Sequence, residues 1–175
     1  MLLPTTTLLS LAALASQAYG HGLVTKPAAR TPGDATAAVC GKTMVNFYKN
    51  DNTSYPEALL RANPSGLKDG YDPKACDLWK CRGFQFADNK ANVFSYKPGD
   101  VVDMEVAIRI PHKGYANVSV IDVAANKVIG EPLLKWGDGY ADGKNFPNLP
   151  KDQLQFSVKV PALSGKCVTA GECVS

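Results

Sequence analysis

The stretch VVDMEVAIRI, residues 101–110, decides the fold class of this chain. Every second residue from Val102 to Ile110 is apolar, and Asp103, Glu105 and Arg109 lie between them. This period of two places the apolar side chains on one face and predicts a strand that is buried on one side. A Pro-Gly turn signal precedes the stretch and a proline follows it, so the strand has a clear beginning and end.

Two further segments, residues 116–123 and 154–160, repeat the alternating pattern. Several short alternating strands separated by Pro and Gly turns predict an all-β fold, an antiparallel β-sandwich. Residues 41–72 differ, because they are rich in Asn, Tyr, Gly and Pro. We expect them to form a long loop insertion with one short helix at residues 56–62. The insertion is either functional or a plain surface excursion.

The first 20 residues predict a signal peptide. They carry no charge, they contain a short apolar stretch, and they end in small residues that suit cleavage after Gly20. The apolar stretch is too short to anchor the chain in a membrane, so we expect a secreted, extracellular protein. Sequons at Asn52 and Asn117 suit secretion, and Asn52, in the loop, is the better glycosylation candidate.

Cleavage would leave residues 21–175 as one domain, because 155 residues support one ordinary core but not two. The net charge of +3 is spread over 19 basic and 16 acidic residues without a run of like charge. This balance points to neither nucleic acid nor an anionic membrane as a partner. We expect a monomer.

Cysteine usage predicts disulfides rather than metal thiolates, since all cysteines follow the expected cleavage site and meet an oxidising compartment. The five cysteines are Cys40, Cys76, Cys81, Cys167 and Cys173. The odd number leaves one thiol free or its partner missing, and we interpret it as truncation of the domain at its C-terminus. The sequence does not fix the pairing; Cys40 with Cys81 and Cys167 with Cys173 is one guess. Trp79, between Cys76 and Cys81, is expected to lie in the core or to cover a disulfide rather than to bind a sugar.

The chain contains only two histidines, His21 and His112, and the first is the expected mature N-terminus. An N-terminal histidine offers its α-amine and its ring Nδ1 to the same metal ion, which no internal residue can do. His112, directly after the strand of residues 101–110, can supply a third nitrogen. Three nitrogens in one plane suit Cu(II) and leave positions open, whereas zinc prefers a tetrahedron. The alternative for His112 is an ordinary loop histidine.

Two segments resemble fungal lytic polysaccharide monooxygenases and their chitin-binding type-4 relatives. The first is HGLVTKPAAR, residues 21–30, because members of that family begin with His and soon reach a Pro and an Arg. The second is PHKGYANVSV, residues 111–120, which is similar to the segment that carries the second copper histidine. The resemblance covers most of residues 21–175.

The resemblance implies an immunoglobulin-like or fibronectin-III-like sandwich that displays one copper ion on a flat surface, held by His21 and His112 as catalytic residues and metal ligands. It implies oxidative cleavage of a crystalline polysaccharide such as chitin or cellulose, with an external electron donor and peroxide or O₂ as co-substrates. Lys26, Arg30 and Tyr115 are the candidates for substrate contact. The alternative for Lys26 and Arg30 is that they are solvated charges, and the alternatives for Tyr115 are packing or a substitute for the axial residue. The chain departs from the family in one respect, since we identify no axial Tyr or Phe on a late strand.

Two other functions stay open. A copper-binding or copper-delivering protein could share the fold and the histidines without oxidising sugar, and a carbohydrate-binding module could use the flat face alone. A Ser-His-Asp hydrolase is disfavoured, because only His112 remains as an ordinary base and the sequence contains no Gly-x-Ser-x-Gly motif.

Overall fold

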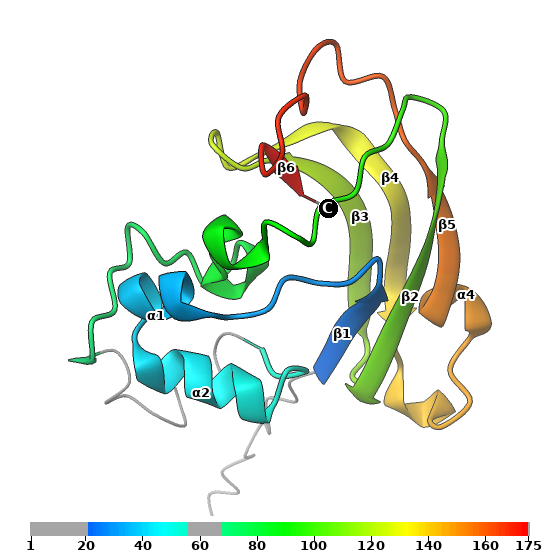
Figure 1. The fold of residues 1–175 in the computed structure, drawn as a ribbon. Coiled ribbons are helices and arrows are strands. Elements are labelled where there is room, and N and C mark those ends of the chain that lie inside the picture. The colour runs from blue at the N-terminus through cyan, green and yellow to red at the C-terminus, as the bar shows by residue number, and fades with distance from the viewer. Residues whose placement is uncertain (1–20, 56–67, 175) are drawn as a thin grey trace, which may run out of the picture.

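The computed structural model describes residues 21–55 and 68–174, and most of its regular structure is strand (Figure 1). The strands form two antiparallel sheets, which confirms the predicted all-β character. The strand bounds are β1 His21–Lys26, β2 Val101–Ile110, β3 Gly114–Asp122, β4 Lys127–Tyr140, β5 Gln155–Lys159 and β6 Cys173–Val174. The immunoglobulin-like arrangement stays a prediction.

The first sheet has the order β1-β2-β5, with β2 in the middle. The alternation of the β2 sequence is visible in its burial, because Met104 is buried while its neighbours Asp103 and Glu105 are more exposed. The β5 strand alternates in the same way around Phe156 and Val158. This strand begins one residue later than predicted, because residues 151–154 form the short helix α4, Lys151–Leu154.

The second sheet has the order β4-β3-β6, and β6 reaches only Ile121 and Asp122 of β3. The long strand β4 is absent from the sequence prediction, since its Gly and Pro residues interrupt any period of two. The two sheets share one core. Met104, Val118 and Val158 are buried in it, and apolar side chains from β1 and β4 pack against them.

A second core holds the helices to the rest of the chain. Helices α1, Asp34–Cys40, and α2, Lys42–Asn50, lie on one side of β1 (Figure 1). Their buried side chains join the loop of residues 76–84, which contains the short helix η2, Cys81–Gly83; a second such helix, η3, spans Phe86–Asn89. The expectation of an irregular insertion over residues 41–72 is therefore wrong for α2, while the expected helix at residues 56–62 lies outside the described residues.

The disulfides pair Cys40 with Cys76 and Cys167 with Cys173, and Cys81 is a free thiol. The guess for Cys167 is confirmed and the guess that Cys40 bonds Cys81 is wrong. The physical reason is packing, because Cys40 and Cys76 are both buried inside the helical core, whereas Cys81 is only half-buried at its edge. Trp79, expected to cover a disulfide, is instead 71% exposed.

The expected signal peptide, residues 1–20, lies outside the described residues. Between residues 21 and 174, leaving out 56–67, no helix is both long enough and apolar enough to cross a membrane. A further 3-10 helix, η4, spans Gly143–Asn145.

Candidate metal centre

Strand pairing brings the two histidines together. His21 is the first residue of β1 and lies opposite Ile110, the last residue of β2. His112 follows Ile110 by two residues, in the short turn that leads into β3. Because β1 and β2 run antiparallel, the start of one strand meets the end of the other. The register therefore places both histidines at the same end of the first sheet, although 90 residues separate them in the sequence.

Both histidines line one half-open pocket of about 230 Å³. The side chains around them come from both sheets, so the pocket lies where the sheets meet at one end of the molecule. The pocket lining includes His21, Ile108, Ile110, His112, Tyr115 and Tyr140.

The ring of His21 is held by packing. The ring lies 5.3 Å from the ring of Tyr55 in an edge-to-face arrangement, and its Nδ1 atom is buried. Within the described residues, that atom has no hydrogen-bond partner. A buried polar atom without a partner is unfavourable by about 1–3 kcal/mol, so native structures usually satisfy such atoms. A metal ion bound to Nδ1 would satisfy it, and this is the nitrogen that the sequence predicts as a ligand.

The donors present fit a copper ion. His21 and His112 offer two imidazoles at one pocket, and cleavage after Gly20 would convert the main-chain nitrogen of His21 from an amide into an amine. Amine and imidazole nitrogens are suitable ligands for Cu(II). Among the described residues, no group of three or more His, Cys, Asp or Glu side chains could hold a metal ion. The predicted chelate needs only two side chains.

Two tyrosines border the pocket in different ways. Tyr115 is 84% exposed, so its ring is free to contact a ligand at the surface. Tyr140 is half-buried at the end of β4, where its hydroxyl donates a hydrogen bond of 3.2 Å to the main-chain oxygen of Gln153. Burial raises the pKa of Tyr140, which keeps it a phenol at neutral pH. Sequence reasoning missed Tyr140, which only the pairing of Gly114 with Tyr140 reveals.

Lys26 and Arg30 lie away from the pocket. Lys26 ends β1, about 17 Å along the strand from His21, and forms a loose ion pair of 3.9 Å with Glu105. Arg30 donates a hydrogen bond of 3.2 Å to the main-chain oxygen of Phe84 and lies over the ring of Phe86. One pocket is thus lined by His21, His112 and Tyr115, whereas the side chains of Lys26 and Arg30 lie outside it. Their contact with substrate stays a prediction.

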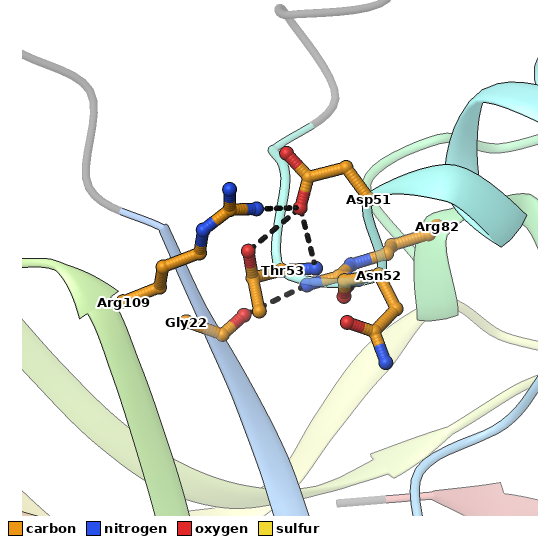
Figure 2. A network of polar contacts seen from close by, with 6 residues as sticks. All are labelled: Gly22, Asp51, Asn52, Thr53, Arg82 and Arg109. Carbon is orange, nitrogen blue, oxygen red and sulfur yellow. Dashed lines mark hydrogen bonds and ion pairs between the residues drawn. The ribbon is translucent and has the colours of Figure 1, made fainter.

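A polar network surrounds the main chain next to His21 (Figure 2). Arg82 donates hydrogen bonds to the main-chain oxygens of Gly22, at 2.9 Å, and of Asn52. The main-chain nitrogen of Gly22 donates to the oxygen of Thr53 at 3.0 Å. Sequence reasoning missed this network, because its members come from three separate segments and no motif links them.

Asp51 fixes the loop of residues 51–55 within this network. Its carboxylate accepts hydrogen bonds from the nitrogen and the hydroxyl of Thr53 and forms an ion pair of 3.1 Å with Arg109 on β2 (Figure 2). Burial alone would raise the pKa of Asp51, but the hydrogen bonds from Thr53 and the charges of Arg109 and His21 outweigh it and lower the pKa. Asp51 is therefore an anion at neutral pH.

The chain matches no model of a protein family, and no curated protein is significantly similar to it. Its function must be argued from the pocket itself.

Proposed function

We propose that the mature chain begins at His21, binds one copper ion at His21 and His112, and cleaves a crystalline polysaccharide oxidatively. The single observation that carries the proposal is the buried Nδ1 of His21, which has no hydrogen-bond partner in the described residues and belongs to a residue that lines a pocket together with His112. The resemblance of residues 21–30 and 111–120 to lytic polysaccharide monooxygenases supports the choice of substrate. The same resemblance supports an immunoglobulin-like sandwich and secretion.

Each residue at the pocket has a part in this proposal. His21 and His112 hold the metal through nitrogen atoms, and copper held there supplies one-electron redox chemistry that activates O₂ or peroxide. Tyr115 offers an exposed ring on which a sugar ring can stack. Tyr140 lines the pocket and keeps its hydroxyl engaged with the main-chain oxygen of Gln153. The half-open shape admits a polymer lying across the surface.

Copper titration of the chain that begins at His21 tests the metal site. We expect one Cu(II) per chain, and we expect His112→Ala to weaken the affinity by at least about tenfold, because one of the three nitrogens is lost. Lys113→Ala is the matched control. Its side chain lies in the same turn but forms an exposed ion pair with Asp138. Equal affinities for His112→Ala and Lys113→Ala would contradict the proposed ligand set.

Mass spectrometry of the soluble products from chitin and cellulose tests the reaction. The copper-loaded chain should release oxidised oligosaccharides only when a reductant such as ascorbate is present, and His112→Ala should release none. If the copper-loaded chain releases no oxidised product from either polymer, the function is copper binding or delivery. Retention on the polymer that persists after chelation would instead favour a carbohydrate-binding module.

A further inference from the structure

We propose that Arg82 is a positioning residue for the metal centre, and that it holds the main chain of His21 and Gly22 in the conformation that presents the His21 nitrogens to one ion. This inference rests on the proposed copper site. It concerns how the protein shapes that site, and Arg82 touches neither the ion nor the substrate in it. Its basis is the pair of hydrogen bonds from Arg82 to the oxygens of Gly22 and Asn52 (Figure 2).

Strand pairing alone holds His21 weakly. Within the described chain β1 is an edge strand, because the sheet order is β1-β2-β5 and only β2 pairs with it. The register between β1 and β2 also shifts between His21 and Gly22, so the ladder is irregular where the ligand lies. An edge strand has one row of main-chain groups without a strand partner. Something outside the sheet must therefore fix the first residues of β1.

The loop of residues 51–55 and Arg82 supply that support. Both main-chain groups of Gly22 are satisfied from outside the sheet, the nitrogen by Thr53 and the oxygen by Arg82. Arg82 also binds the oxygen of Asn52, so one guanidinium ties the loop to the strand. A planar guanidinium can donate to two acceptors at fixed angles, so these two hydrogen bonds fix the orientation of the loop relative to β1.

The backbone around Arg82 has an unusual conformation that sets the position of this side chain. Cys81, Arg82 and Gly83 have φ values of 48°, 56° and 76°, three successive residues in the left-handed region. Non-glycine residues are uncommon in that region, and they persist there only when the surrounding structure fixes them. Gly83 supplies this close packing. Its backbone lies so near the disulfide that a Cβ atom on it would be 2.6 Å from Sγ of Cys76 and 2.9 Å from Sγ of Cys40.

Arg82 is thus anchored at both ends. The next residue along the chain, Gly83, packs against the buried Cys40–Cys76 disulfide, and the Arg82 guanidinium lies 5.6 Å from the ring centre of the buried Tyr48. The loop that Arg82 binds has a second attachment, since Asp51 pairs with Arg109 next to Ile110, the partner of His21. A continuous set of contacts therefore runs from the helical core to the histidine pocket.

Copper binding to Arg82→Gln and Arg82→Lys tests the inference. Both variants are made in the chain that begins at His21, and Lys80→Gln is the matched control. Lys80 belongs to the same segment and also binds a main-chain oxygen, but that oxygen belongs to Val123. We expect Arg82→Gln to weaken Cu(II) affinity roughly tenfold and to change the electron paramagnetic resonance spectrum of the bound ion, because residues that orient a ligand have effects of this size.

Arg82→Lys keeps the charge but cannot hold two oxygens in one plane, so we expect a partial loss of affinity and an intermediate spectrum. If Arg82 has a purely structural role, the metal-free variants will unfold at a lower temperature. The Cu(II) affinity of the folded variants and the electron paramagnetic resonance spectrum of the bound ion will then be unchanged. This result would overturn the inference. Should Arg82→Gln fail to fold, Arg82→Lys decides by the same two measurements. A wild-type chain that binds no copper would overturn the proposed function as well, which separates the two failures.

Discussion

Gly83 is the residue at which a single methyl group has the clearest expected effect. Its φ of 76° disfavours any side chain, and a Cβ atom would lie within 3 Å of both sulfurs of the Cys40–Cys76 disulfide. We expect Gly83→Ala to lower the free energy of unfolding by about 3 kcal/mol, since backbone strain and overpacking act together. Urea unfolding followed by tryptophan fluorescence measures the loss.

Gly130→Ala separates the two causes. Gly130 has a similar φ of 71°, but no heavy atom lies within 4 Å of its Cβ position. This variant should therefore lose only the backbone contribution, about 1 kcal/mol. Equal losses of stability in the two variants would show that the sulfurs can move away. The close packing at Gly83 would then contribute nothing to the free energy of unfolding.

The residues of the candidate site differ in how far sequence could predict them. His21 and His112 could be singled out because they are the only histidines and because one follows an expected cleavage site. Arg82 and Tyr140 could not, since an Arg after a Cys and a Tyr after a Gly carry no local signal. Their roles arise from contacts between segments far apart in the chain. Local patterns do not encode such contacts.

At the scale of elements, helix α1 depends on a carboxylate from another segment. The side chain of Asp88, in η3, accepts hydrogen bonds from the nitrogens of Gly33, Ala35 and Thr36 and from the hydroxyl of Thr36. These nitrogens belong to the helix N-terminus, where main-chain donors have no partner inside the helix. Burial acts to raise the pKa of Asp88, but these hydrogen bonds outweigh it and lower the pKa.

This balance predicts a pH dependence. The unfolded chain binds a proton at Asp88 more readily than the folded chain, so the contribution of Asp88 to stability is complete above the ordinary pKa of about 4 and is lost as the pH falls through the lower folded pKa. We expect Asp88→Asn to be less stable than wild type by about 2 kcal/mol at pH 7. The difference should shrink below about pH 3. Urea unfolding at both pH values measures it, and a difference that is constant with pH would contradict the assignment.

The same feature explains why sequence reasoning found three of the strands, β2, β3 and β5, and missed helices α1 and α2. The strand of residues 101–110 carries its period of two within its own sequence, and Met104 is buried as that period requires. Helices α1 and α2 follow Gly33 and Gly41, which provide no side-chain cap. Their caps come from Asp88 and Asp69, far along the chain, so the local signal for a helix start is missing.

At the scale of the whole molecule, the start of β1 lies at a junction. The sheets share one core and the helices share another with the loop that carries Arg82, and β1 runs between the two parts (Figure 1). His112 follows a strand of the sheets, whereas His21 is secured to the helical part through Gly22. The two predicted ligands therefore depend on contacts from both parts. A metal ion bound to both histidines should stabilise the molecule as a whole.

Copper should therefore raise the unfolding temperature, and only in a chain that begins at His21. At a free copper concentration one hundred times the dissociation constant, binding contributes about 2.7 kcal/mol. For a domain of this size, that corresponds to a rise of roughly 5–10 °C in the unfolding temperature. Differential scanning calorimetry with and without one equivalent of excess Cu(II) measures the shift, and His112→Ala should show little of it.

A chain that retains Gln17 to Gly20 ahead of His21 is the decisive control. It contains every side chain of the site and differs only in that the nitrogen of His21 is an amide, which lacks the free lone pair of an amine. Without metal, we expect both chains to unfold at the same temperature, because the contacts of β1 are shared. With copper, only the chain that begins at His21 should gain stability. If the longer chain gains as much, the N-terminal nitrogen is not a ligand, and the site would consist of the two imidazoles alone.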